Sequence, residues 1–204
     1  MMDVPKVLAF DTSAAHCAAA LFCAGRIVAE RHKEMGRGQA ERLMPILQAI
    51  LDEAGLGWEA LDGIGVGIGP GNFTGIRIAV AAARGLALGL SVPAIGVSGF
   101  EAMAEGAAGP VLVALPGPRG TVYLQPLADG MALAPPRQAA PEEMADALPP
   151  GARLIGPGGF DGIAPRIARI AATRLGRALP RPAPLYLRPA DAAPPADPPP
   201  VILP

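Results

Sequence analysis

The chain has 204 residues, of which 51% are hydrophobic and only 17% are charged, and its formal net charge is −1. This composition is typical of a folded domain or two small lobes with an apolar core, and it excludes a disordered chain. Affinity for nucleic acid depends largely on Lys and Arg neutralising phosphates, so a near-neutral chain has little electrostatic drive to bind RNA alone. Any role with RNA is therefore expected to run through a partner protein.

The cysteines and the N-terminal sequence indicate a reducing, soluble compartment. Cys17 and Cys23 lie six residues apart in one predicted strand, which separates them by roughly 20 Å, too far for a disulfide. The start of the chain has no basic segment followed by an apolar run. The apolar run at 78–90 contains Arg84 and is too short to span a bilayer. The sequence predicts a cytoplasmic protein without membrane contact.

The first half of the chain predicts a mixed sheet with two helices, and its second and third strands form a hairpin around Ala24-Gly25. The helical segments show apolar side chains at three- and four-residue steps. The expected elements are strands at 7–11, 17–23, 26–31, 61–68 and 94–97 and helices at 39–54 and 76–89. This order is typical of a ribonuclease-H-like lobe.

The second half repeats this pattern more weakly, with strands expected at 111–115, 121–127 and 153–156 and helices at 141–148 and 163–179. We therefore expect an N-terminal lobe over 1–105 and a smaller C-terminal lobe over 106–188. Prolines crowd the remaining residues and preclude both helix and sheet there, so 189–204 is expected to be an extended, disordered tail.

The most specific segment is Gly69-Pro70-Gly71-Asn72-Phe73-Thr74-Gly75, which follows a predicted strand and opens a helix. Its glycines permit backbone conformations closed to other residues, and a helix N-terminus offers unpaired N–H groups to an anion. No Lys-Ser or Lys-Thr pair follows the glycines, so it is not a Walker A loop. Two interpretations stay open: a tight turn capped by Asn72, or a phosphate site formed by Gly69, Gly71, Asn72, Thr74 and Gly75.

The end of the first predicted strand carries Asp11, Thr12 and Ser13. In actin-like ATPases an acidic residue followed by small hydroxyl residues sits at this position, beside metal and phosphate. The same three residues can instead form an Asx-type turn that satisfies local backbone N–H groups. The sequence leaves both interpretations open, so weak nucleotide binding at these residues stays a hypothesis.

Metal and nucleophile motifs are absent from the sequence. Its only histidines, His16 and His32, form neither an HxxxH nor an HExxH pair. The serines that could act as nucleophiles, Ser13, Ser91 and Ser98, have no plausible histidine partner by position. We therefore predict no metal site and no catalytic residue.

The helix expected at 76–90 carries more apolar surface than its own sheet needs to cover. Its only charged residues are Arg77 and Arg84, whereas a helix packed on a sheet needs an apolar face only about 100° wide. Either the neighbouring helix 39–54 covers the surplus, or both helices form an interface with a partner. The residues predicted for this interface are Leu43, Met44, Leu47, Ile50 and Leu51 from the first helix and Ile76, Arg77, Val80, Ala83 and Arg84 from the second.

Three segments together resemble the TsaB family, also called YeaZ: residues 7–13, residues 41–45 and, above all, residues 66–77. The GPG-x-FTG-x-R element within the last segment is specific, although Asn72 stands where the family usually has Ser. The resemblance covers residues 5 to about 105; beyond that, only residues 120–123 and 186–188 are similar to the family.

The resemblance implies an α/β protein of two actin-like (ribonuclease-H-like, ASKHA) lobes, with mixed sheets flanked by helices and a reduced C-terminal lobe. It implies a non-catalytic scaffold subunit that supports the transferase TsaD, which installs threonylcarbamoyl on adenosine of tRNA next to the anticodon. The implied partners are TsaD, the ATPase TsaE through the complex, and a second copy when the protein is alone, with tRNA contacted only indirectly. No cofactor is implied, and an autonomous actin-like ATPase or sugar kinase is the alternative.

Overall fold

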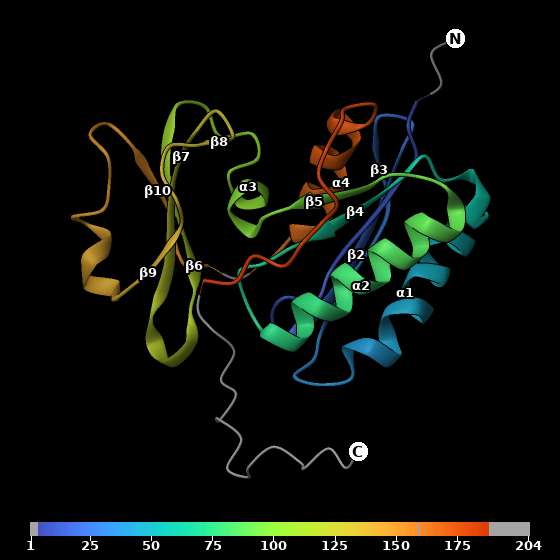
Figure 1. Cartoon of the computed structure of the whole chain (residues 1–204), viewed down its shortest axis with the longest axis horizontal. Helices are drawn as coiled ribbons and strands as arrows, with labels where there is room; N and C mark the ends of the chain where they lie inside the picture. The colour runs from blue at the N-terminus through green and yellow to red at the C-terminus, as the bar shows by residue number, and fades with distance from the viewer. Residues whose placement is uncertain (1–3, 159, 188–204) are drawn as a thin grey trace, which may run out of the picture.

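The computed structural model describes residues 4–158 and 160–187 and contains two sheets (Figure 1). The first sheet has the order β3-β2-β1-β4-β5, in which β1, β4 and β5 are parallel and β2 is antiparallel to both of its neighbours. Its strands are β1 (Val7–Asp11), β2 (His16–Cys23), β3 (Arg26–Glu34), β4 (Gly63–Gly67) and β5 (Ala94–Val97). The helices are α1 (Gln39–Glu53), α2 (Phe73–Leu90), α3 (Gly99–Met103) and α4 (Ile163–Arg174).

The first sheet is the middle layer of an α/β/α arrangement, with α1 and α2 on one face and α4 on the other (Figure 1). Successive residues of a strand point to opposite faces, so each strand supplies both layers. In β1, Leu8 and Phe10 pack with the side chains of α1 and α2, whereas Val7 and Ala9 pack with those of α4. All four are fully buried, which explains why this strand reads as a continuous apolar run.

The second sheet has the order β10-β6-β7-β8, and β9 also pairs with β7. Its strands are β6 (Pro110–Pro116), β7 (Val122–Ala128), β8 (Met131–Ala132), β9 (Arg137–Ala139) and β10 (Arg153–Ile155). Short 3₁₀ turns occur at η1 (Trp58–Ala60), η2 (Pro118–Gly120) and η3 (Pro141–Met144). The pairing of β10 with β6 is parallel and that of β6 with β7 antiparallel, so this sheet is mixed as well.

One apolar cluster joins the two sheets through α3 and the start of α4. It includes Val97 of the first sheet, Phe100 of α3 and Val113 of the second sheet, together with Phe160, which precedes α4, and Ile163, its first residue. The helix α4 therefore packs on the first sheet although the chain reaches it only after completing the second sheet.

The segment after α4 returns along β5, the edge strand of the first sheet. Leu185 N–H donates to the carbonyl of Ile68 over 2.8 Å. A Cβ added to Gly96 would lie 3.4 Å from the Cβ of Pro182. This segment covers part of an exposed sheet edge and ends beside the N-terminus of α2.

Most predicted elements of the chain are confirmed, and two helices are shorter than expected. The helix predicted at 163–179 ends at Arg174, because Leu175 turns to an extended conformation and Gly176 takes a φ of 76°. The helix predicted at 141–148 is only the 3₁₀ turn η3, followed by irregular turns. The tail predicted at 189–204 lies outside the described residues.

By length and composition alone, α2 could cross a membrane. About a third of it is buried inside the chain's own fold, and the core helix of a globular protein meets the same criteria. The helix begins after the cap residue Asn72 and ends at Ser91, which has a left-handed conformation (φ 57°).

Candidate functional site

The two segments predicted to form a site meet at one edge of the first sheet. Because β1 and β4 are parallel neighbours, the residues after both strands emerge at the same edge. The N–H of Asn72 donates to the carbonyl of Ser13 over 2.6 Å. The hydroxyl of Thr12 donates to the carbonyl of Gly75, also over 2.6 Å.

Two glycines allow this close contact between the loops. A Cβ on Gly71 would lie 2.1 Å from the carbonyl oxygen of Ser13, and a Cβ on Gly75 would lie 1.9 Å from that of Thr12. Both obstacles are backbone atoms, which cannot move aside as a flexible side chain can. Glycine is therefore required at both positions by close approach of the backbone.

Asp11 is the centre of a buried hydrogen-bonded cluster at this edge. Its Oδ1 accepts from the Ser13 N–H (2.9 Å), from the Ser13 hydroxyl (2.8 Å) and from Nε2 of His16 (2.7 Å). The exposed fractions of Asp11, Ser13 and His16 are 1%, 1% and 4%. The Asx-type turn that the sequence allowed is therefore present.

Sequence reasoning missed His16 as a member of this cluster. The available signal was the spacing Asp11-x-Ser13-x-x-His16 across a tight turn between antiparallel strands. The His16 ring also contacts Phe160 edge-on, with ring centroids 5.7 Å apart, and lies 5.0 Å from that of His32. His16 thus links the turn after β1 to the beginning of α4, so its role in the structure is to connect segments.

Two backbone donors of the glycine loop, at Asn72 and Gly75, bond to the chain itself. The Asn72 side chain accepts from the Gly75 N–H over 2.9 Å, and the Ile76 N–H donates to the Asn72 carbonyl. A free helix N-terminus is what attracts a phosphate, so these bonds favour the capped-turn interpretation. In the described chain, Oδ2 of Asp11 is the buried side-chain oxygen left without a hydrogen bond.

An aromatic cluster joins the glycine loop to the last described residues. Phe73 stacks on Tyr186 with ring centroids 4.7 Å apart, and Arg77 lies over the Phe73 ring at 4.0 Å. The Nε of Arg77 donates to the Tyr186 hydroxyl over 2.9 Å. These contacts bring together two stretches that resembled one family in the sequence and fix the returning segment against α2.

The nearby thiol is unsuited to nucleophilic chemistry. Burial in β2, with a smaller contribution from the Asp11 carboxylate, raises the pKa of Cys17 to about 11. The thiolate is the reactive form, so Cys17 stays protonated and inert at neutral pH. Both cysteines are free.

The structure corrects which residues of α1 and α2 can form a partner surface. Seven of the ten predicted interface side chains are at most 4% exposed and pack against the first sheet: Leu43, Leu47, Ile50, Leu51, Ile76, Val80 and Ala83. The exposed ones are Met44, at 42%, and the two arginines Arg77 and Arg84. The periodicity identified the buried face correctly, but that face serves the chain's own core.

The outward face of α2 contains an uncharged stripe beside its two exposed arginines. Thr74, Ile78, Ala81, Gly85 and Leu88 follow one another at four- and three-residue steps, which places them on one stripe of the helix. Ile78 is half-buried and the other four are exposed, Leu88 at 84%. We call these five residues the outer stripe. It carries no charge and, at Gly85, has open space where a side chain would be.

No group of three or more His, Cys, Asp or Glu side chains within 4–158 and 160–187 is arranged to hold a metal ion. Asp11 and His16 are both residue types that can bind a metal, but their side chains bond to each other.

Comparison with known families assigns the chain. A family model described as TsaD, tRNA N6-adenosine threonylcarbamoyltransferase, matches residues 27–183, well over half of the chain. This chain belongs to that family. The match begins within β3 and includes β4, β5, the glycine loop, the second sheet and α4, while β1 and β2 precede it.

Individual relatives agree with this assignment. The Escherichia coli protein named tRNA threonylcarbamoyladenosine biosynthesis protein TsaB is 40% identical over 124 residues, covering 58% of this chain and 53% of that protein. The Bacillus subtilis protein of the same name is 32% identical over 123 residues, covering 57% of this chain and 52% of that protein. The resemblance to TsaB is confirmed, while the chain spans about half the length of the curated relatives it matches.

A solved structure extends the likeness over nearly the whole chain. A Pseudomonas aeruginosa protein described as similar to the peptidase YEAZ matches with a TM-score of 0.72 and 28% identity, covering 90% of this chain and 100% of that one. A second structure, YeaZ from the same organism, gives a TM-score of 0.70. The predicted fold class, an α/β protein of actin-like type with two mixed sheets, is confirmed.

Proposed function

We propose that this protein is a non-catalytic, cytoplasmic subunit of the complex that installs threonylcarbamoyl on adenosine of tRNA next to the anticodon. In this role it binds and supports a TsaD-type transferase, joins a TsaE-type ATPase through the complex, and contacts tRNA only through its partners. Alone, it forms a homodimer, and it neither enters a membrane nor requires a cofactor. The names of the Escherichia coli and Bacillus subtilis relatives, which describe threonylcarbamoyladenosine biosynthesis, support this proposal.

The observation that carries the proposal is the outer stripe of α2. Some apolar side chains of α2 lie on the side of the helix that is turned away from the sheet. Burying them against a partner stabilises a complex by about 25 cal/mol per Å² of apolar surface removed from water. Ala81 and Gly85 let a second helix approach closely, and Leu88 projects beyond them. Arg77 and Arg84 flank the stripe and provide charged groups at its border.

The partner role is favoured over an autonomous ATPase or sugar kinase. The backbone donors at Gly75 and Ile76 and the hydroxyls of Thr12 and Ser13 bond to groups of the chain itself. A phosphate bound through these donors would have to replace those bonds. The loops therefore support a structural role for Asp11 and the glycine segment.

The test is co-purification of this protein with the TsaD-type transferase of the same organism, followed by size-exclusion chromatography. The variant Ala81→Glu places a charge in the middle of the outer stripe without touching the core, and it should abolish co-elution. The matched control is Met131→Glu, because Met131 is a 73% exposed apolar residue on the second sheet. The control should bind like the unmodified protein.

Leu47 is unsuitable for this test although it was among the predicted interface residues. It is fully buried, so Leu47→Glu would unfold the chain and lose binding for that reason alone. Co-elution that survives Ala81→Glu, or that is lost equally with Met131→Glu, would contradict the proposed surface. Transferase activity of the purified chain alone would contradict the non-catalytic role.

A further inference from the structure

A pocket of about 580 Å³ lies at the end of α2 opposite to the glycine loop. The end of α2 and the turn at 91–93 form one wall, the start of β5 forms the floor, and residues of the segment after α4 form the other wall. An 18-residue helix separates this pocket from the glycine loop, a distance of about 27 Å. The two places are therefore independent of each other.

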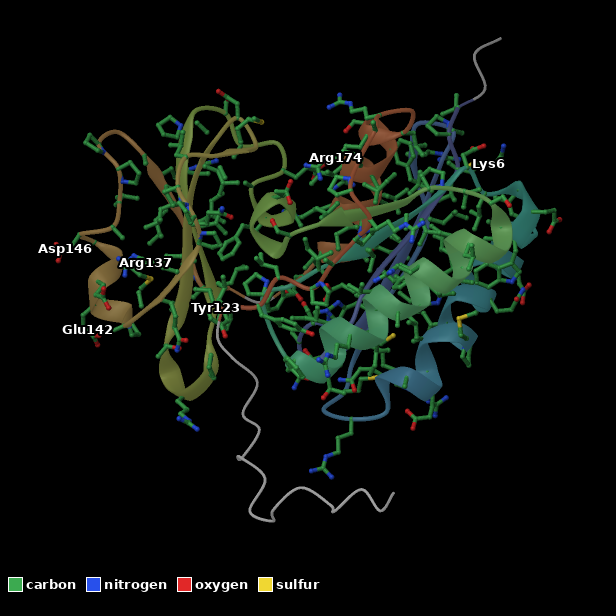
Figure 2. The ribbon with its side chains drawn as sticks, in the orientation of Figure 1. Lys6, Tyr123, Arg137, Glu142, Asp146 and Arg174 are labelled. Carbon is green, nitrogen blue, oxygen red and sulfur yellow. The ribbon has the colours of Figure 1, made fainter. Side chains whose placement is uncertain are left out.

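Four arginines line this pocket, and they come from three parts of the chain. Arg84 belongs to α2, Arg174 is the last residue of α4, and Arg177 and Arg181 lie in the segment that follows. Figure 2 labels Arg174, which lies on α4 on the side toward α3. None of the described residues that line the pocket is acidic. A protein with a net charge of −1 thus gathers a strong local positive charge at one pocket.

Within the described residues, only one of these arginines is engaged by other groups of the chain. The Arg174 guanidinium donates to Glu101 over 2.5 Å and to the carbonyl of Gly96 over 3.3 Å. The guanidinium groups of Arg84, Arg177 and Arg181 have no hydrogen-bond or ion-pair partner among the described residues. Arg174 is therefore held in place, while three cationic groups around it keep their donors available.

The rest of the pocket is apolar. Leu88 is 84% exposed and Leu179 is 42% exposed, and both line it together with Val92, Pro93 and Ile95. The negative end of α2 also borders the pocket, but the N–H groups of Ser91 and Val92 bond to its last carbonyls. A ligand that fits this lining has an anionic end for the arginines and an apolar or planar part for the leucines.

We propose that this pocket binds a nucleotide, with its phosphates on Arg84, Arg177 and Arg181 and its base against Leu88 and Leu179. Arginine presents a planar fork of donors that matches phosphate oxygens, and ligand pockets of this size are typical for small molecules. The near-zero net charge argues for a small ligand over RNA, because RNA binding draws on an extended basic surface. This site goes beyond the partner role, but it meets the outer stripe at Leu88 and its border at Arg84, so it is tested on the chain without a partner.

The experiment is calorimetric titration of the full chain in low salt with three probes: ADP, pyrophosphate and adenosine. ADP should bind more tightly than pyrophosphate, and adenosine should bind least. Raising the salt concentration should weaken the binding of ADP, because the contacts are ionic. Each of the variants Arg177→Glu and Arg181→Glu should weaken ADP binding by about tenfold or more, as expected when a charge-assisted hydrogen bond is replaced by repulsion.

The matched control is Arg26→Glu, an exposed arginine at the start of β3 on the opposite edge of the first sheet. It should bind ADP like the unmodified chain, and circular dichroism should show all variants folded. The proposal is overturned if neither ADP nor pyrophosphate binds at millimolar concentration, or if both reversals leave binding unchanged. It is also overturned if a single-stranded RNA binds while ADP does not, which would make this a surface for RNA. None of these variants lies on Ala81, so failure here leaves the partner test intact.

Discussion

The two sheets of this protein differ in how completely helices cover their faces. The first has helices on both faces, and every residue of β1 and β4 is buried. The second shares one face with the common core. Its other face carries a cluster of five buried side chains, which among the described residues only Met144, Ala147 and Leu148 cover: Leu112, Ala114, Val122, Leu124 and Ala139. Figure 2 shows Arg137, Glu142 and Asp146 on this outer side, at the far end of the molecule.

This difference suggests how the protein divides its tasks. The glycine loop, the outer stripe and the arginine pocket all involve the first sheet or its helices, which form a rigid, doubly covered support. Surfaces that must recognise something are more precise on rigid elements than on thinly covered ones. The following variants test whether the first sheet is as rigid, and the second as adaptable, as this comparison implies.

The largest effect is expected at the contact between the glycine loop and the end of β1. Gly75→Ala forces a Cβ against the backbone of Thr12, 1.9 Å away, and should destabilise the chain by about 4 kcal/mol or more. Gly85→Ala, in the same helix with open space around it, should stabilise it by about 0.5–1 kcal/mol. Urea unfolding measures both values. Equal effects of the two alanines would show that the loops adapt.

The next effect compares the two cores directly. Leu47→Ala and Leu124→Ala both truncate a leucine that is at most 1% exposed, one under α1 and one in the small cluster of the second sheet. We expect about 3 kcal/mol for Leu47 and about 2 kcal/mol for Leu124, because a thinly covered site collapses more readily around a cavity. Urea unfolding measures both, and a larger loss at Leu124 would reverse the comparison.

A pH titration tests burial in the first sheet. Because the pKa of Cys17 is raised to about 11 in the folded chain from 9.0, the folded state holds its proton longer than the unfolded state does. The resulting stability is fully present below pH 9 and is lost as the pH rises through about 11, a change of roughly 2–3 kcal/mol. Urea unfolding at pH 8 to 11 of the unmodified chain and of Cys17→Ala isolates this change as the difference between their slopes. Parallel slopes would show that Cys17 is hydrated.

The smallest effect is expected at the joint between the two sheets. Arg169 on α4 forms two hydrogen bonds to Glu105, over 2.5 and 2.8 Å, and this carboxylate raises the pKa of the guanidinium. Both side chains are partly exposed, so Glu105→Gln should cost about 1 kcal/mol in low salt and less in high salt. The control Glu53→Gln removes a more exposed pair with Arg31 and should cost less than about 0.5 kcal/mol. Thermal unfolding at two salt concentrations distinguishes them.

Local patterns made much of this fold predictable. The spacing of Leu43, Leu47 and Ile50 identified α1, because that signal lies within a few residues of sequence. The cap at Asn72 was recognised as one possibility, but α2 begins at Phe73, three residues before the predicted start at Ile76. The ends of the later helices were less predictable. Nothing local distinguishes the region after Arg174 from more helix until Gly176 and the returning segment are seen to leave it.

The candidate sites divide in the same way. The sequence showed that Asp11 and the glycine loop were unusual, but it did not show His16 beside Asp11 or Tyr186 beside Phe73. The interface prediction on α1 and α2 named mostly side chains that are buried in the chain's own core, since periodicity reveals an apolar face without telling what covers it. The arginine pocket left no trace in the sequence, as Arg84 and Arg181 lie almost a hundred positions apart.

By itself, the sequence determined the family, the order of the strands of the first sheet with α1 and α2, and the segments whose glycines and caps specify local turns. Only the tertiary structure decided which faces of α1 and α2 remain outside, that α4 packs on the first sheet, and that three uncommitted arginines share one pocket. Backbone propensity and capping act over a few residues and can be read along the chain. Burial and charge neighbourhood depend on which distant segments meet, and that is settled only when the whole core has formed.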